Sequence, residues 1–148
     1  MLEGCPQGMS PQGRLEMHDN PRFVARWMSR DLETTTPGAS LADALEVMER
    51  RRIRHLPVLD EGGLVGLLSD RDTRRCLDGG QSAEAASVRE VMTPAQKLRC
   101  VAPGTTVREA AELICREKIN SLPVVQGETL VGIVTSEDLL WAFLEEPE

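Results

Sequence analysis

The amino-acid sequence predicts an α/β (α+β) protein built from two tandem strand-helix-strand-strand-helix units that pack into one module. The first observation behind this prediction is an internal repeat: residues 37–76, shifted by 66 positions, fall on residues 103–142 with 13 identities in 40 pairs. The second observation is that helical and strand-like patterns follow each other in the same order in both copies. Because one unit of this size cannot bury its apolar face alone, the two copies are expected to share a core.

Each copy is expected to begin with a short apolar strand, at residues 32–35 and 98–101, followed by a Pro-Gly loop signal. A polar capping residue with an acidic residue three positions later then predicts the start of the first helix. These capping pairs are Ser40 with Asp43 and Thr106 with Glu109. Behind them, apolar residues recur at the i, i+3, i+4, i+7 spacing of an amphipathic helix, over residues 41–48 and 107–114.

A Leu-Pro-Val segment at residues 56–58 and 122–124 predicts the next strand, since proline is tolerated near the start or at the edge of a strand. A turn joins it to an apolar run at residues 64–69 or 130–135. These two runs are apolar almost throughout, which predicts strands that are buried on both faces. A second helix is expected to begin at Asp70 and, in the second copy, at Ser136.

The repeat also predicts the domain organisation. Residues 1–20, with several Gly and Pro residues, are expected to form a flexible tail, and the small polar residues 81–87 a linker. The first unit then spans residues 21–80 and the second spans residues 88–145.

Composition excludes several classes of protein. The chain has 17 Lys and Arg residues against 24 Asp and Glu residues, a net charge of −7, and only 3% aromatic residues. It therefore lacks the basic surface and the stacking platforms that a nucleic-acid-binding protein uses. No apolar stretch is long enough to span a bilayer and no signal peptide begins the chain, so a cytoplasmic location is expected.

The sequence also gives no indication of catalysis. Two histidines and four cysteines without a C-x-x-C spacing predict no metal site. There is no Walker-type phosphate loop, no Gly-x-Ser-x-Gly motif and no His-Glu-x-x-His motif. We therefore expect no catalytic residues and no required cofactor.

Several motifs resemble those of the cystathionine β-synthase (CBS) domain family. Each copy ends its last strand in a characteristic segment, Gly-Leu-Leu-Ser-Asp-Arg-Asp at 66–72 and Gly-Ile-Val-Thr-Ser-Glu-Asp at 132–138. The Leu-Pro-Val strands, and Trp-Met-Ser (27–29) and Val-Met-Thr (91–93) ahead of the two copies, strengthen the match. Two such units in tandem resemble a Bateman module, and the resemblance covers residues 21 to 145.

This resemblance implies a non-catalytic sensor that binds an adenosine-containing ligand (AMP, ADP, ATP or S-adenosylmethionine) in clefts between the paired units. It also implies a homodimer that regulates a partner protein, whose identity the sequence does not give.

The residues themselves favour a nucleotide site where the last strand of each copy runs into a helix. Free backbone N–H groups at a helix N-terminus bind phosphate. A hydroxyl (Ser69, Thr135) adds a donor there, and a carboxylate one turn later (Asp72, Asp138) is placed to accept the hydroxyls of a ribose.

Glycines in the last strands are interpreted as room for a flat ring, and Ile53, Leu56 and Leu122 as apolar walls beside the prolines. The candidate ligand-binding residues are Arg54, His55, Pro57, Gly66, Ser69, Arg71 and Asp72 in the first copy and Ile119, Ser121, Pro123, Gly132, Thr135 and Asp138 in the second.

The same residues have simpler interpretations. Ser-x-x-Asp and Thr-x-x-Asp are ordinary helix caps, and glycine in a strand also marks close packing. The alternative function is therefore a ligand-free scaffold for dimerisation or protein interaction. Trp141 and Phe143, near the end of the last helix, are expected either to close the core or to contact a second subunit.

The two copies differ in charge. The first has Arg54 and Arg71 where the second has Asn120 and Glu137. Because arginine binds phosphate well, the first copy is expected to prefer phosphorylated adenosine and the second a less charged ligand.

Overall fold

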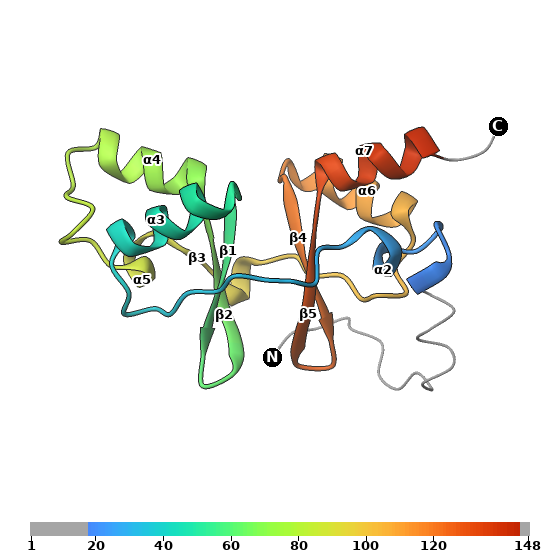
Figure 1. Ribbon diagram of the computed structural model, residues 1–148, viewed down its shortest axis with the longest axis horizontal. Helices are drawn as coiled ribbons and strands as arrows, with labels where there is room; N and C mark the ends of the chain where they lie inside the picture. The colour runs from blue at the N-terminus through green and yellow to red at the C-terminus, as the bar shows by residue number, and fades with distance from the viewer. Residues whose placement is uncertain (1–17, 146–148) are drawn as a thin grey trace. The chain divides into compact units, whose positions relative to one another are not determined.

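A computed structural model describes residues 18–145 of the chain (Figure 1). The predicted N-terminal tail falls almost entirely outside these described residues. The backbone contacts divide the described chain into two compact units. We call residues 32–98 the continuous unit, and residues 18–31 together with 99–145 the split unit.

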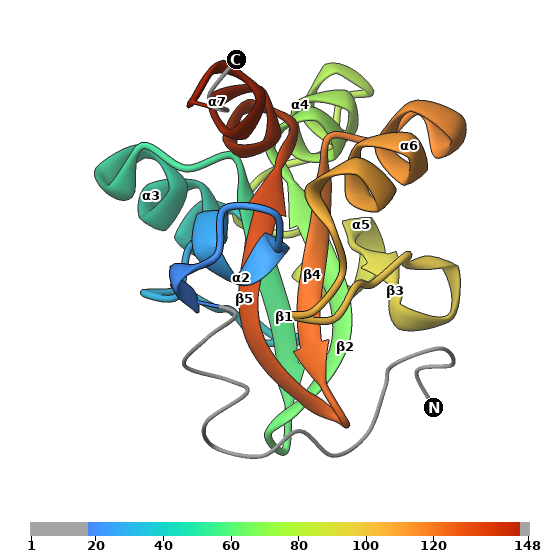
Figure 2. The same ribbon diagram turned by 90° about the vertical axis from the view of Figure 1, so that its right-hand side faces the viewer.

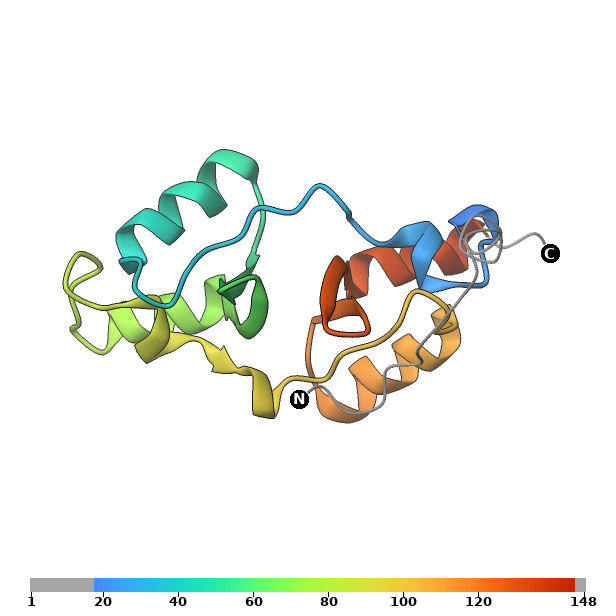
Figure 3. The same cartoon turned by 90° about the horizontal axis from the view of Figure 1, so that it is seen from below.

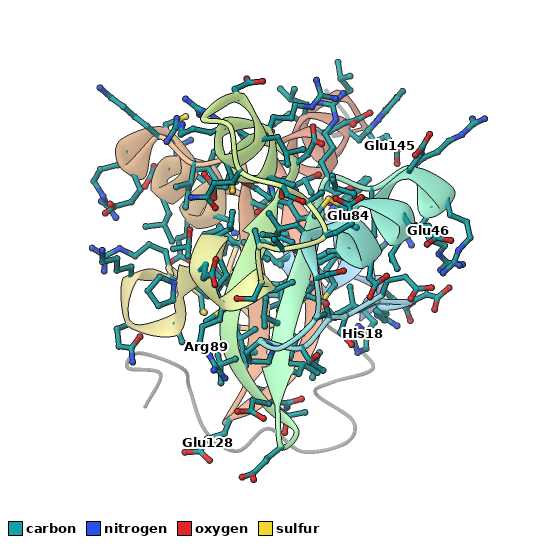
Figure 4. All side chains as sticks on the ribbon, turned by 90° about the vertical axis from the view of Figure 1, so that its left-hand side faces the viewer. His18, Glu46, Glu84, Arg89, Glu128 and Glu145 are labelled. Atoms are coloured by element: carbon teal, nitrogen blue, oxygen red, sulfur yellow. The ribbon has the colours of Figure 1, made fainter. Side chains whose placement is uncertain are left out.

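The continuous unit is an antiparallel three-stranded sheet in the order β1-β2-β3, with α3 and α4 on one face of the β1-β2 hairpin (Figure 3). Its elements are α3 (Leu41–Arg51), β1 (His55–Asp60), β2 (Gly63–Ser69), α4 (Asp70–Asp78), α5 (Val88–Val91), β3 (Thr93–Pro94) and a 3₁₀ turn at Ala95–Lys97. Leu41, Leu56, Val58, Leu68 and Val88 are 0% exposed and form the centre of its core. The opposite face of α3 is charged, and Figure 4 shows Glu46 there on the outside of the helix.

The split unit is a two-stranded antiparallel sheet, β4-β5, packed against three helices (Figure 2). Its elements are α2 (Val24–Trp27), α6 (Val107–Glu117), β4 (Ser121–Gln126), β5 (Thr129–Thr135) and α7 (Ser136–Glu145). Val24, Ala25, Ala110, Leu122, Val124 and Val134 are 0% exposed in its core. The mixed fold class and the tandem repeat predicted from the sequence are confirmed.

The capping pairs begin the first helices as predicted. In α3, the backbone N–H of Asp43 donates to Ser40 Oγ at 3.1 Å. In α6 the exchange is reciprocal: Glu109 N donates to Thr106 Oγ1 at 3.1 Å, and Thr106 N donates to Glu109 Oε2 at 2.9 Å. Each bond satisfies an N–H group that has no partner inside the helix.

The two hairpins repeat each other even in their irregularity. His55 pairs with Ser69 and Ser121 pairs with Thr135 at corresponding ends, and both ladders shift register just after the Leu-Pro-Val segment. The strands predicted at residues 32–35 and 98–101 are reduced to single parallel bridges, Thr35 to Val58 and Val101 to Val124. Each bridge makes only two backbone hydrogen bonds before the Pro-Gly loop turns the chain away.

Burial of β2 and β5 differs from the prediction. Only residues 66–68 and 132–134 are buried without a break; in β2 the buried Leu64 stands between the partly exposed Gly63 and Val65, and residues 129–131 of β5 are exposed or partly exposed. The hairpin tips extend beyond the helices of their own unit (Figure 1).

The segments ahead of the two copies exchange places. Ser29 pairs with Ile133 of β5, and Thr93 and Pro94 pair with Leu67 and Gly66 of β2. The leading segment of the first copy therefore completes the second copy, and that of the second copy completes the first. The short helices follow the same rule: Val24 N donates to Thr105 O at 2.9 Å and Val88 N donates to Ala39 O at 2.9 Å.

The compact units consequently do not coincide with the sequence boundaries of the repeat. The segment predicted as a linker, residues 81–87, also packs within the continuous unit. There Ala86 is 4% exposed and its carbonyl accepts a hydrogen bond of 3.0 Å from Leu41 N.

Two glycines make the exchange possible. A Cβ atom added at Gly66 would lie 2.5 Å from Met92 Sδ and 2.9 Å from the carbonyl oxygen of Thr93. A Cβ atom at Gly132 would lie 2.6 Å from Met28 Sδ and 3.0 Å from the carbonyl oxygen of Ser29. Only glycine lets the leading segment approach each strand this closely, because any side chain would displace backbone as well as methionine.

We expect Gly66→Ala and Gly132→Ala to lower the free energy of unfolding by about 1–3 kcal/mol, the usual cost of overpacking. Urea denaturation measures this. Gly38→Ala is the matched control, because an added Cβ there meets no atom within 4 Å. Equal stability of the three variants would contradict the close-approach explanation.

Candidate functional site

The first candidate site is the point where β2 runs into α4, which we call the first junction. Ser69 caps α4, and its Oγ accepts a hydrogen bond of 3.0 Å from Asp72 N. The N–H of Asp70 donates to Arg54 O at 2.8 Å, which holds the start of β1 beside the start of the helix. Asp72 lies half-buried in the first turn of α4, where the positive end of the helix dipole favours an anion.

The second junction, where β5 runs into α7, has the same backbone but a different cap. Ser136 N donates to Asn120 O at 2.9 Å, as Asp70 N does to Arg54 O. Here, however, the Asp138 carboxylate reaches back: its Oδ2 accepts from Thr135 N at 2.8 Å and from Thr135 Oγ1 at 3.0 Å. Asp138 N in turn donates to Thr135 Oγ1 at 3.2 Å.

The two junctions therefore offer different groups to a ligand. The Thr135 hydroxyl proton and one oxygen of Asp138 are used within the cap. Within residues 18–145, Ser69 Oγ accepts one bond and donates none, and the Asp72 carboxylate makes no reciprocal cap bond. The first junction thus keeps a free hydroxyl donor and a free carboxylate.

Charge also distinguishes the junctions. Arg54 and Arg71 are exposed beside the first junction, and Asn120 and Glu137 occupy their places at the second. Of the neighbouring arginines, Arg51 is engaged with Glu33 at 3.3 Å. The first junction is the one suited to a phosphate group.

His55 lies opposite Ser69 at the start of β1 and is half-buried. Burial lowers the pKa of His55 below its ordinary value of 6.5, and the positive charge of Arg54 lowers this pKa further. The carboxylates of Asp72 and Asp70 oppose this shift. In the second copy the same position holds Ser121, a non-titrating side chain that is 6% exposed.

The structure places Arg54, His55, Ser69, Arg71 and Asp72 at the first junction, and Ser121, Thr135 and Asp138 at the second. It gives other residues different surroundings. Leu56 and Leu122 are fully buried in the cores of their own units and are not available as walls of a site, contrary to the sequence-based interpretation. Pro57 and Pro123 are buried, and Ile53 and Ile119 are half-buried.

The glycine interpretation also needs correction. The space beside Gly66 and Gly132, which the sequence suggested for a flat ring, is filled by Met92 and Met28. The structure therefore explains both glycines by close packing.

The sequence did not point to Thr73, which supports the first junction. Thr73 is 0% exposed, and its Oγ1 donates to Ser69 O at 2.9 Å. The signal for it was present, since threonine in the first turn of a helix commonly bonds a carbonyl four residues earlier.

The described residues show neither a group of three His, Cys, Asp or Glu side chains arranged to hold a metal ion nor a helix long and apolar enough to cross a membrane.

Comparison with known protein families agrees with this repeated architecture. The CBS domain profile matches the chain twice, at residues 24–79 and 88–145. The chain belongs to the CBS domain family. The expectation of a tandem CBS pair is thereby confirmed.

Among curated relatives, the CBS pair is 31% identical over 113 residues to the CBS domain-containing protein YhcV of Bacillus subtilis, covering 76% of this chain and 79% of that one. It is 29% identical over 139 residues to protein MJ1225 of Methanocaldococcus jannaschii, covering 87% of this chain and 50% of that one. Its match to inosine-5'-monophosphate dehydrogenase of the same organism is 34% identical over 113 residues but covers only 21% of the enzyme, against 75% of this chain. The chain thus spans half or less of these last two relatives.

Solved structures show the same fold. The CBS pair aligns with a CBS-domain protein from Burkholderia ambifaria at a TM-score of 0.79 and 27% identity, covering 85% of this chain and 96% of that one. It aligns with the CBS domain pair of protein MJ0100, in complex with 5'-methylthioadenosine and S-adenosyl-L-methionine, at a TM-score of 0.74 and 29% identity. That alignment covers 82% of this chain and 94% of that one. It aligns with CBSX2 in complex with AMP at a TM-score of 0.73 and 28% identity, covering 86% of this chain and 99% of that one.

The lowered pKa of His55 predicts a pH dependence of stability. Because the unfolded chain binds a proton to this histidine more readily than the folded chain, protonation favours unfolding. The stability that the neutral His55 ring contributes to the folded chain is therefore fully present above the ordinary pKa of 6.5 and is lost as the pH falls below it. In urea titrations between about pH 7.5 and pH 5.5, His55→Gln should lose less stability on acidification than the wild type. His18→Gln, in the split unit, is the control, and equal pH slopes for wild type and His55→Gln would contradict the assignment.

Proposed function

We propose that this CBS pair is a non-catalytic regulatory module that binds an adenosine-containing ligand and signals its presence to a partner protein. The candidate ligands are AMP, ADP, ATP and S-adenosylmethionine. Support comes from the family and from two relatives whose structures contain AMP, or 5'-methylthioadenosine with S-adenosyl-L-methionine.

The first junction carries the proposal. Its Ser69 hydroxyl and the backbone N–H of Arg71 are donors for phosphate oxygens, since Asp70 N and Asp72 N already donate to Arg54 O and Ser69 Oγ. The Asp72 carboxylate, which is not used in a reciprocal cap, accepts hydrogen bonds from the two ribose hydroxyls. Arg71 and Arg54 supply positive charge beside the phosphate, and His55 adds a ring nitrogen at the edge of the same junction.

We propose a less charged ligand at the second junction, because Glu137 replaces Arg71 and the Thr135 hydroxyl proton is already donated to Asp138. The remaining oxygen of Asp138 accepts from ribose. Contacts of Pro57, Ile119, Ser121 and Pro123 with the adenosine moiety remain predictions. Gly66 and Gly132 act indirectly, by letting the leading segments approach β2 and β5.

The ligand-free scaffold remains the alternative. The closed cap between Thr135 and Asp138 favours it for the second junction, because a carboxylate that stabilises its own helix needs no ligand to explain it. Under either function we expect a homodimer in the cytoplasm.

Thermal unfolding with AMP, ADP, ATP, adenosine and S-adenosylmethionine tests ligand binding. At 100 times its Kd, a true ligand adds about 2.7 kcal/mol of stability. For a chain of this size, that should raise the midpoint by about 5–10 °C. If no compound shifts the wild type, the scaffold is the correct function.

Matched variants separate binding from capping. Asp72→Asn should abolish the shift produced by its ligand, while Asp43→Asn, at the equivalent position of the other capped helix in the same unit, should keep it. Asp138→Asn has Glu109→Gln as its control, since each breaks a reciprocal cap in the split unit. Loss of a residue that only caps lowers the free energy of unfolding by the ~1 kcal/mol typical of a cap, and so lowers the midpoint, but it leaves the ligand-induced shift intact.

Ligand preference is tested by calorimetry with AMP and adenosine. Arg71→Ala should weaken AMP binding about tenfold and leave adenosine binding nearly unchanged, because only AMP carries the phosphate. Glu137→Ala should improve AMP binding at the second junction, since it removes a negative charge. Unchanged preference in both variants would show that these residues do not select the ligand.

A further inference from the structure

His55 brings a titrating side chain to the first junction. It pairs with Ser69 across the β1-β2 ladder. Cross-strand partners carry their side chains on the same face of a sheet, with Cβ atoms about 5 Å apart. Ser69 Oγ in turn accepts a hydrogen bond of 3.0 Å from Asp72 N, so this face leads to the N-terminus of α4. The His55 ring therefore lies beside the donors that are suited to a phosphate group.

The charged groups around the His55 ring act in opposite directions. Burial lowers the pKa of His55 from its ordinary value of 6.5, and the positive charge of Arg54 lowers it further. The carboxylates of Asp72 and Asp70, from α4, raise this pKa but do not offset the other two effects. β2 contributes the uncharged Ser69. Without a ligand, the ring is therefore neutral at pH 7.

The helix α3 also packs against β1, and it is basic at its end. Its C-terminal arginines are exposed to solvent, and one of them is paired with Glu33 at 3.3 Å. They are Arg50, Arg51 (the paired one) and the capping residue Arg52. Their charge favours a phosphate in this region and, like that of Arg54, favours a neutral histidine.

A bound phosphate would reverse the balance at the ring. A phosphate group carries between one and two negative charges near neutral pH, more than either carboxylate. An opposite charge within about 4–6 Å raises the pKa of a histidine by about one unit or more. The protonated ring can then donate a charge-assisted hydrogen bond to a phosphate oxygen. The proton comes from the solvent, and no bond of the ligand is broken.

We propose that the first junction couples the binding of a phosphorylated ligand to the protonation of His55, so that binding tightens as the pH falls from about 8 to about 6. The inference rests on the proposed adenosine-binding function and adds a form of regulation to it. The module responds to its ligand and to acidification together. By linkage, the proton taken up on binding and the pH dependence of the Kd are the same effect.

The repeat supplies a comparison within the same chain. At the second junction Ser121 takes the place of His55 and pairs with Thr135 at the corresponding end of the hairpin. A serine hydroxyl does not titrate near neutral pH. Of the two junctions, the first is therefore the one whose ligand affinity should depend on pH in this range.

Calorimetry of the full chain with AMP, at several values between about pH 8 and pH 6, tests the coupling. The Kd of the wild type should fall about three- to tenfold over this range, the effect of a pKa difference of up to one unit. Buffers with different ionisation enthalpies then report how many protons are taken up per AMP bound. Adenosine, which has no phosphate, should show neither effect.

Variants assign the coupling to one residue. The phosphate of AMP itself takes up a proton near pH 6, which weakens its attraction to the junction. His55→Gln has this effect alone, so its Kd for AMP should stay level or rise toward pH 6, opposite to the wild type. His18→Gln is the matched control, because His18 (Figure 4) belongs to the split unit, and it should keep the wild-type profile.

NMR of the wild type gives a second measurement, which does not depend on the folding of His55→Gln. The chain has two histidines, so the ring protons of His18 and His55 can be followed separately. His18→Gln identifies which signal belongs to which residue. AMP should raise the pKa of His55 and leave that of His18 unchanged, whereas adenosine should change neither.

The outcomes separate this inference from the proposed function. If AMP binds with the same pH profile in the wild type and in His55→Gln, and the pKa of His55 does not change, the coupling is overturned and the proposed function stands. If none of AMP, ADP and ATP binds at any pH, the phosphate site and the coupling are both overturned.

Discussion

One backbone hydrogen bond in each unit holds the candidate site together. Asp70 N donates to Arg54 O at 2.8 Å, and Ser136 N donates to Asn120 O at 2.9 Å. Each bond ties the residue before the hairpin to the first residue of the following helix, so the hairpin, the helix N-terminus and the capping hydroxyl are fixed together. Because a backbone hydrogen bond fixes these elements together, the side chains around it can differ between the copies. Asn120 takes the place of Arg54 while the backbone hydrogen bond stays the same.

Much of this fold is predictable from the sequence because the information is local. The caps at Ser40 and Thr106 and the following apolar periodicity require only neighbouring residues to agree. The exchange of the leading segments is different. Met28 and Met92 carry no local sign of which strand they cover, and the close approach at Gly132 and Gly66 depends on residues far along the chain. The sequence therefore predicts the repeat but not how the leading segments complete it.

The candidate site shows the same limit. The sequence predicts equivalent roles for Ser69 and Thr135, since each is followed three residues later by an aspartate. Which oxygen accepts and which hydroxyl donates depends on side-chain rotamers that the motif does not specify. Of the two aspartates, Asp138 turns back onto its own cap and Asp72 does not. A motif present twice thus gives one closed junction and one open junction.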